Sequence, residues 1–286
     1  MGASAERPDG VTVAGTLWLV GTPIGNLGDL TERARERLAA ADVIAAEDTR
    51  RTRALLTHLG VEGRRLLSFH DANERRRIPE LLDHLRGGRD VAVVSDAGMP
   101  GLSDPGYRLV SACIAEGIAV DVAPGPSAPI AALVISGLPA DRFVFEGFLP
   151  RRAGQRRSRL AALARETRTI VAFESPRRVA ATLGEAREVL GDRRAAVVRE
   201  LTKVHQEVRR GRLSELAEAF AGEVLGEVVV VIEGAGPREP DLAALAARVE
   251  KLMSGGVSRK EASARVAAES GASTRAVYQA SLDRRD

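Results

Sequence analysis

Acidic side chains stand at several points where an apolar run of the sequence ends. They are Glu47, Asp48, Asp96, Glu174 and Glu200. Carboxylates at such positions can accept hydrogen bonds from ribose hydroxyls, activate a hydroxyl or hold an arginine. Asp96 is the best placed of them, because it lies at the start of the Gly- and Pro-rich loop 95–106, directly after the apolar run 91–94. For Glu47 and Asp48, capping of the following helix explains the residue types as well as catalysis does.

A basic segment could bind phosphate. Residues 151–159 hold Arg151, Arg152, Arg156, Arg157 and Arg159 and no acidic residue. Guanidinium groups make bidentate contacts with phosphate, although a solvated surface loop is an alternative interpretation. We favour phosphate contact, since a run of arginines without an acid is unusual for a mixed surface.

Three loops rich in Gly and Pro each follow a predicted strand, at residues 21–26, 95–106 and 124–128. Ligands of open α/β sheets bind beyond the carboxyl ends of the strands, so these loops could line one cleft. Taken alone, loop 95–106 is explained equally well as a cofactor loop or as a plain strand-to-helix turn. No loop has the dinucleotide or the P-loop glycine pattern, which argues against phosphate-cradling nucleotide chemistry.

Metal and thiol chemistry find little support. The four histidines are scattered, with no His/Cys pair at ligand spacing, so we predict no metal site. Cys113 lies within a predicted helix, not at a strand end where a nucleophile would be placed. A Ser-His-Asp arrangement stays open, but no G-x-S-x-G turn is present.

The elements that must position these residues alternate along the chain. Strands predicted near 16–20, 43–46, 66–69, 91–94 and 119–123 are separated by helices, which indicates a mainly parallel sheet. Asp104 and Pro105 are predicted as N-cap and first residue of a helix that covers 107–116. Later strands are predicted at 143–145, 169–173, 195–198 and 228–232, and the last is wholly apolar and therefore interior.

We predict an α/β protein with a loose extension (1–15), two α/β domains (16–138 and 139–236) and a helical tail (241–286) that contains a capping box at 258–261. A chain of 286 residues with 44% hydrophobic residues can form such cores. Charge, Pro or Gly interrupts every apolar run, so no membrane span is predicted, and the first fifteen residues do not form a secretory signal. The single cysteine fits a reducing cytoplasm.

Together these motifs resemble the tetrapyrrole-methylase superfamily, and within it the enzymes that methylate small-subunit ribosomal RNA. The matching segments follow one another in family order between residues 16 and 234. They are 21–26 (GTPIGN), 46–50 (AEDTR), 95–98 (SDAG) with 103–106 (SDPG), 124–127 (PGPS), 146–150 (EGFLP), 174–176 (ESP) with Arg178, and 199–203 (RELTK).

The resemblance implies two α/β domains with S-adenosylmethionine in the cleft between them, usually in a homodimer. It implies 2'-O-methylation of a cytidine in the decoding region of 16S rRNA, with the rRNA or the small ribosomal subunit as partner. By position, the cofactor contacts would come from Pro23, Asp96, Gly98, Met99, Ser127, Ala128 and Phe173. The chain departs from the family at Met99, where Thr is usual, and at Phe173 and Arg177, where Tyr and His are frequent.

Within this framework, Asp96 would fix the cofactor while Asp48 or Glu47 orients or deprotonates the ribose hydroxyl. RNA phosphate would be held by Arg50, Arg151, Arg152, Arg156 and Arg157. One alternative is a methyltransferase of the same superfamily acting on a small molecule such as a porphyrin or corrin, which would need neither the basic segment nor the helical tail. Another is a non-enzymatic RNA-binding protein, which would not bind S-adenosylmethionine.

Overall fold

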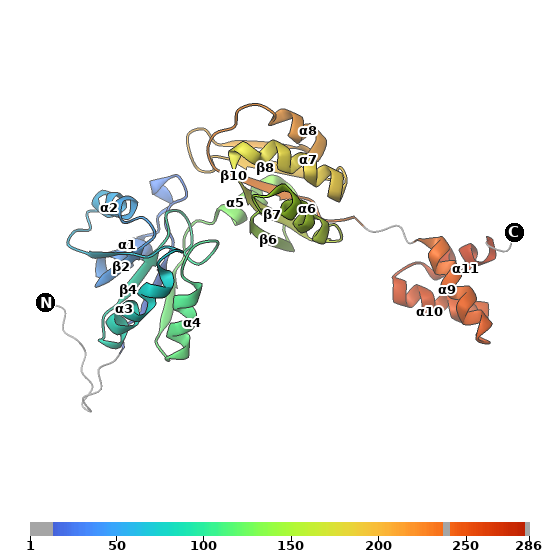
Figure 1. Ribbon diagram of the computed structural model, residues 1–286, viewed down its shortest axis with the longest axis horizontal. Helices are drawn as coiled ribbons and strands as arrows, with labels where there is room; N and C mark the ends of the chain where they lie inside the picture. The colour runs from blue at the N-terminus through green and yellow to red at the C-terminus, as the bar shows by residue number, and fades with distance from the viewer. Residues whose placement is uncertain (1–13, 237–240, 284–286) are drawn as a thin grey trace. The chain divides into compact units, whose positions relative to one another are not determined.

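The computed structural model of the protein describes residues 14–236 and 241–283. The chain forms two compact units, residues 1–235 and 236–286 (Figure 1). Most of the predicted extension 1–15 lies outside the described residues, as do residues 237–240, which join the second predicted α/β domain to the predicted helical tail. None of the described helices is both long and apolar enough to cross a bilayer.

The first sheet is built from five parallel strands in the order β3-β2-β4-β1-β5. The strands are β1 (Leu17–Val20), β2 (Val43–Ala46), β3 (Arg65–Ser68), β4 (Val91–Val94) and β5 (Val120–Ala123). The helices between them are α1 (Glu32–Ala40), α2 (Thr49–His58), α3 (Glu74–Arg86) and α4 (Tyr107–Ala115), with a 3-10 turn η1 (Leu27–Asp29). Because parallel strands need crossover helices, the alternation predicted a parallel sheet, and this prediction is confirmed.

Helices cover both faces of the first sheet. Leu38 of α1 and Leu56 of α2 pack with Ile44 on one face. Leu85 of α3 and Leu109 of α4 pack on the other face. The strands β2 and β4 are buried at every position, so they carry no alternating polar side chains.

The second sheet is mixed, in the order β6-β7-β10-β8-β9. Its strands are β6 (Phe143–Phe148), β7 (Thr169–Glu174), β8 (Arg194–Arg199), β9 (Glu207–Arg212) and β10 (Val228–Ile232). β6 and β7 are parallel and the other pairs antiparallel. β10 is central and fully buried, as its apolar sequence predicted. β9 escaped prediction because its sequence EVRRGR is charged, which only an edge strand tolerates.

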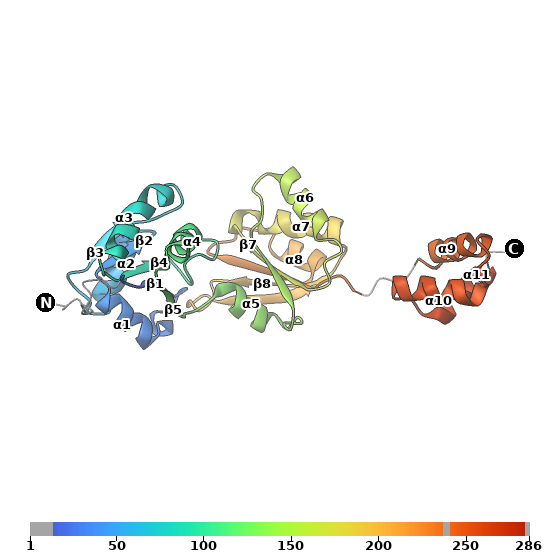
Figure 2. The ribbon, with the colours of Figure 1, turned by 90° about the horizontal axis from the view of Figure 1, so that it is seen from below.

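Helices α6 (Ala153–Ala162), α7 (Val179–Leu190), which follows the 3-10 turn η2 (Pro176–Arg178), and α8 (Leu213–Ala219) cover one face of the second sheet. The other face is covered by α5 (Ala128–Ser136) (Figure 2). Ala132 and Leu133 of α5 pack against Val229 and Val231. Thus α5 follows a strand of the first sheet but packs on the second. The proposed domain boundary at 138/139 stays a prediction.

The C-terminal unit is helical, as predicted, with α9 (Leu242–Ser254), α10 (Arg259–Ser270) and α11 (Thr274–Asp283). Val249, Val266 and Val277, one from each helix, are buried in its core. The side chain of Ser258 accepts a hydrogen bond from the amide of Glu261, as in the predicted capping box.

Replacing Gly184 by Ala should stabilise the protein by about 0.5–1 kcal/mol, because glycine within a helix loses more backbone entropy on folding than alanine does. Gly184 lies inside α7, and a Cβ built there meets no atom within 4 Å. Chemical denaturation of G184A and wild type measures the difference. An unchanged or lower free energy of unfolding would contradict the expectation.

Candidate functional site

The strand ends of the first unit enclose a pocket of about 490 Å³, the strand-end pocket. Its lining includes the loop after β4 (residues 96–104) and the start of α5, together with Phe173 at the end of β7 and Val198 of β8. Residues from both sheets therefore form one cavity. This is the position at which open α/β folds bind ligands.

Close backbone contacts hold the loop after β4, which lines this pocket, against the loops after β1 and β5. The amide of Thr22 donates to the carbonyl of Gly98 at 2.9 Å, and the amide of Gly98 donates to the carbonyl of Thr22 at 3.1 Å. A Cβ on Gly21 would lie 2.6 Å from Cα of Gly125 and 2.8 Å from Sδ of Met99. The loops after β1, β4 and β5 therefore approach one another as closely as glycine allows.

Hydrogen bonds lock the acidic residues after β2 and β4 together. The amide of Asp96 donates to Oε2 of Glu47 at 3.1 Å, and the amide of Asp48 donates to Oδ1 of Asp96 at 3.1 Å. The second oxygen of Asp96 lies 3.2 Å from the guanidinium of Arg51. Asp48 caps α2 by accepting from the amide of Arg50, and the hydrogen bonds from Arg50 lower the pKa of Asp48. The side chains of Glu47 and Asp48, the two residues predicted to be catalytic, thus accept hydrogen bonds from backbone amides. Of the two, only Glu47 lines the pocket.

Six of the seven residues predicted to contact the cofactor line the strand-end pocket. They are Asp96, Gly98, Met99, Ser127, Ala128 and Phe173. Pro23 does not; it lines a neighbouring pocket with Thr22 and Leu55. Phe173 contacts the rings of Phe145 and Phe148, each with a centroid distance of 5.1 Å, which holds its ring at the pocket wall.

The pocket residues fit S-adenosylmethionine by chemistry. Gly98, at φ 85°, leaves the backbone uncovered where a side chain would otherwise stand. Ile24, Phe173 and Val229 supply apolar walls for an adenine ring. The charged side chains of the lining are Glu47, Arg51, Asp96, Asp104, Glu174 and Glu227. This excess of carboxylates favours a ligand with positive charge and with hydroxyl groups.

The prediction that Asp104 caps the following helix is wrong. α4 begins at Tyr107 with Gly106 as its N-cap, and Gly106 has φ 140°, which favours glycine. Oε1 of Glu74, which is buried, accepts a hydrogen bond from the amide of Gly106 at 3.0 Å, and Oε2 pairs with Arg108 at 2.6 Å. The carboxyl of Asp104 therefore has no capping role and lines the pocket instead.

Asp104 is the functional candidate that sequence reasoning missed. Burial raises its pKa to about 7, and the negative charges of Glu47, Asp71 and Asp96 add to the rise, while a hydrogen bond with Ser95 acts against it. Its signal in the sequence is an acid within a loop where Gly and Pro alternate. Asp104 was predicted to be a helix cap because Asp followed by Pro is common at the start of a helix.

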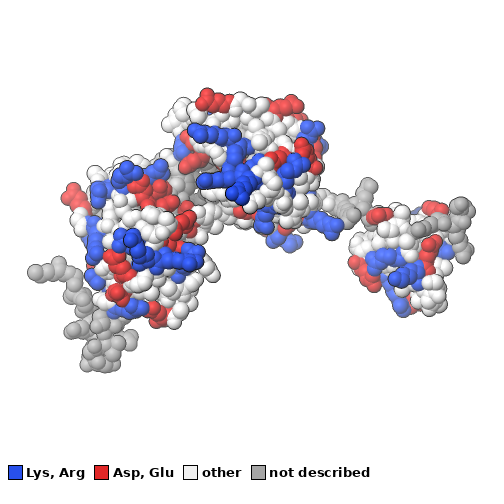
Figure 3. Space-filling model, in the orientation of Figure 1, with Lys and Arg blue, Asp and Glu red and all other residues white. Residues whose placement is uncertain are grey.

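The predicted RNA-binding arginines have different environments. Lys and Arg side chains gather over the region of α6 and α7 (Figure 3). Arg151 and Arg152 are exposed, and the side chain of Arg50 is 88% exposed beside Asp48. Arg157 is half-exposed and pairs with Glu188 at 2.6 Å. These four can reach a phosphate without unfolding the protein.

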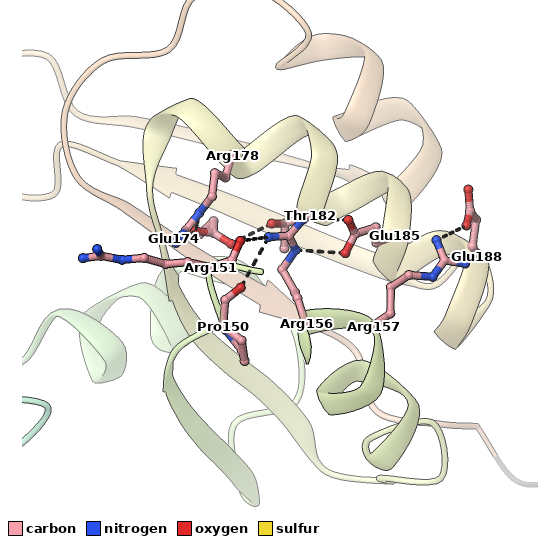
Figure 4. Close-up of polar contacts among 9 residues, drawn as sticks. All are labelled: Pro150, Arg151, Arg156, Arg157, Glu174, Arg178, Thr182, Glu185 and Glu188. Carbon is pink, nitrogen blue, oxygen red and sulfur yellow. Dashed lines mark hydrogen bonds and ion pairs between the residues drawn. The ribbon is translucent and has the colours of Figure 1, made fainter. Parts of the chain in front are cut away.

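Arg156 requires a correction. Its side chain is buried and makes two hydrogen bonds with Glu185, at 2.9 and 2.6 Å (Figure 4). Its third nitrogen donates to the carbonyls of Pro150 and Arg151, at 3.3 and 3.2 Å. Because its donors are occupied inside the protein, Arg156 is not a phosphate ligand. It fixes the backbone from which Arg151 and Arg152 extend.

Comparisons with known proteins match this fold and site. The family model "Tetrapyrrole (Corrin/Porphyrin) Methylases" matches residues 16–217. The ribosomal RNA small subunit methyltransferase I of Mycobacterium tuberculosis (strain CDC 1551 / Oshkosh) is 53% identical over 275 residues, which cover 95% of this chain and 96% of that protein. Its namesake from Escherichia coli O157:H7 is 43% identical and covers 94% of this chain and 95% of that protein.

Solved structures agree on the fold. A uroporphyrin III C-methyltransferase from Thermus thermophilus has a TM-score of 0.55 at 23% identity, covering 77% of this chain and 97% of that one. The methyltransferase CobJ has a TM-score of 0.58 at 22% identity, covering 79% and 97%. The predicted fold class is confirmed: an α/β fold of the tetrapyrrole-methylase type, with two sheets and a helical segment after them. The chain belongs to the tetrapyrrole methylase family and, within it, to the ribosomal RNA small subunit methyltransferases I.

Proposed function

We propose that the protein transfers the methyl group of S-adenosylmethionine to the 2'-hydroxyl of a cytidine ribose in the decoding region of 16S rRNA. The observation that carries the proposal is the carboxylate-lined strand-end pocket, in a chain that matches ribosomal RNA small subunit methyltransferases I over nearly its whole length. The substrate is the rRNA or the small ribosomal subunit, so the protein would act in the cytoplasm.

The cofactor, when bound, supplies an activated methyl group. Asp96, Gly98 and Met99 from the loop after β4, with Ser127, Ala128 and Phe173, would hold it. The enzyme must then align the ribose oxygen with the methyl carbon, and such orientation can contribute as much as about 7–11 kcal/mol to lowering a barrier. We propose that Glu47 and Asp48 keep Asp96 in place for this alignment, because a hydrogen bond joins each of them to Asp96.

RNA phosphates would be held by Arg50, Arg151, Arg152 and Arg157. These side chains are exposed or half-exposed, and guanidinium groups at the surface bind phosphate with a strong dependence on salt.

Replacing Arg151 and Arg152 together by Gln should weaken RNA binding and lower its dependence on salt. Each lost phosphate contact reduces the slope of log K against log salt by about 0.7 for a single-stranded site. Filter binding of an rRNA fragment over a series of salt concentrations measures this. Arg35→Gln, which removes an exposed arginine on α1 paired with Glu32, is the matched control and should leave the slope unchanged. Equal slopes for the double variant and the control would refute the assignment.

We also propose that two copies associate. Among the described residues, α4 exposes Tyr107 and Ile114, and α5 exposes Ile130 and Val134. Exposed apolar side chains on one face of a helix are typical of surfaces that become buried in an assembly. Light scattering of the purified protein measures its mass in solution.

The decisive experiment incubates the purified protein with labelled S-adenosylmethionine and small ribosomal subunits from cells that lack the protein. Nuclease digestion then locates the label. Label on a cytidine ribose supports the proposal. Cofactor binding without label on RNA would instead favour a small acceptor such as a porphyrin or corrin. Absence of cofactor binding would favour an RNA-binding protein without activity.

A further inference from the structure

We propose that the carboxylate of Asp104 accepts the proton of the ribose hydroxyl while the methyl group is transferred. The inference rests on the proposed function and names a catalytic residue for it. Asp104 lies in the lining of the strand-end pocket, together with Asp96 and Met99 of the same loop. A proton acceptor in this pocket would stand beside the position at which the hydroxyl and the methyl donor meet.

The other carboxylates of the pocket are already engaged by donors of the protein. Glu47 accepts from the amide of Asp96, and Asp96 pairs with Arg51. Glu174 is buried and accepts from the guanidinium of Arg178 and, at 2.6 Å, from the hydroxyl of Thr182 (Figure 4). Glu227 pairs with Lys203 at 3.0 Å.

Asp104 differs from Asp96, Glu174 and Glu227, which pair with cations, and from Glu47, which holds the backbone amide of Asp96. Among the described residues no basic side chain lies within ion-pair distance of it, and its hydrogen bond is with Ser95. Its lone pairs are therefore available to a substrate. A carboxylate held by a cation is a weak base, because the cation stabilises its charged form.

The loop that carries Asp104 is held in a defined shape. Ser103 has φ 66°, in the left-handed region that side chains other than glycine rarely adopt. Ser103 also lies close to Gly147, at the irregular end of β6: a Cβ built on Gly147 would be 3.2 Å from Oγ of Ser103. Glu74 anchors the loop at the amide of Gly106. A base must be positioned within hydrogen-bond reach of the proton it removes, and these contacts supply that positioning.

The electrostatics of the pocket suit the task. Glu47, Asp71 and Asp96, which follow β2, β3 and β4, place negative charge near Asp104, while Arg51 of α2, which also lines the pocket, pairs with Asp96. With its pKa near 7, Asp104 is half deprotonated at neutral pH and is a stronger base than an ordinary carboxylate. As the ribose oxygen bonds to the methyl carbon, the carbon–sulfur bond breaks, its electron pair stays on sulfur, and the hydroxyl proton passes to Asp104.

Asp104→Asn tests the inference in the full chain. With labelled S-adenosylmethionine and small ribosomal subunits, we expect the single-turnover rate to fall by about 10²–10⁴, the usual contribution of a general base. Cofactor affinity and thermal unfolding should stay near wild type, because the amide keeps the shape of the side chain. The wild-type rate should rise with pH below about 7 and level off above it.

Asp71→Asn is the second variant. Asp71 is exposed and does not line the strand-end pocket, but its negative charge raises the pKa of Asp104. Removing that charge lowers the pKa, so the rise in rate should move to lower pH while the plateau stays unchanged. A merely structural role of Asp104 predicts no such movement.

Full activity of D104N overturns the inference, as does a wild-type rate that does not vary with pH near neutrality, or an unmoved profile in D71N. These outcomes leave the proposed function standing if the wild type labels a cytidine ribose. A wild type that binds the cofactor but labels no RNA contradicts the proposed function itself, and the inference falls with it.

Discussion

Gly21→Ala should abolish most cofactor binding. The new methyl group would lie 2.6 Å from Cα and 2.7 Å from N of Gly125, and both are backbone atoms that cannot turn away. To relieve the clash, the loops after β1 and β5 must separate, and Met99, whose sulfur lies 2.8 Å from the same point, must move. Overpacking of this kind costs about 1–3 kcal/mol, which corresponds to about a 5- to 150-fold loss of affinity if the whole cost falls on the cofactor-bound state.

Isothermal titration of G21A with S-adenosylmethionine measures the loss. Gly184→Ala is the matched control, since its added methyl group meets open space and lies outside the strand-end pocket. Gly125→Ala should reproduce the defect from the opposite loop, because its Cβ would lie 2.9 Å from Cα of Gly21. A dissociation constant for G21A equal to that of the control would show that these loops do not shape the cofactor site.

Arg156→Ala should destabilise the protein by about 3–5 kcal/mol, because it leaves the carboxylate of Glu185 largely buried without its partner. The side chains of Arg156 and Glu185 are 5% and 14% exposed. The neighbouring pair of Arg157 with Glu188 is 49% and 61% exposed, so Arg157→Ala should cost less than about 1 kcal/mol. Adjacent arginines of one helix thus provide a buried and an exposed ion pair for comparison.

Denaturant unfolding of both variants measures the contrast. Replacing the pair as a whole, with Arg156→Met and Glu185→Leu, should recover most of the loss, since apolar residues of similar size substitute well for a buried ion pair. Equal stabilities for R156A and R157A would mean that the buried pair contributes nothing beyond its exposed neighbour.

Helical periodicity explains why Arg156 is buried and does not bind phosphate as predicted. In α6 the residue lies one turn before Leu160, which is buried in the core of the second sheet, so both share the inner face. The run of arginines predicted an exposed, phosphate-binding face, whereas the four-residue spacing between Arg156 and Leu160 indicates that Arg156 faces the core. Burial of its partner Glu185 on α7 could not be foreseen, because the packing of α6 against α7 is a tertiary property.

β1, β2 and β4 were predictable because each is a short apolar run that is followed within two residues by Gly or an acid. The same rule failed for β9, whose charges are permitted by its edge position alone. The strand-end loops were recognised as a candidate site, and the structure places them around one pocket. The role of Asp104 depends on the left-handed backbone of Ser103 and Gly106, which a local sequence pattern does not reveal.

The central place of β10 in the second sheet has a consequence for biosynthesis. β10 is the last strand of that sheet to be made, yet it separates β7 from β8 and pairs with both. Until residue 232 has left the ribosome, β7 and β8 each keep an unpaired edge, the kind of surface that recruits other strands. The first sheet, complete by residue 123, can fold earlier, as N-terminal domains generally do during synthesis. A nascent chain stalled between these points would have formed the lining that the first sheet gives to the strand-end pocket, while the unpaired strands of the second sheet stayed open to aggregation and to chaperones.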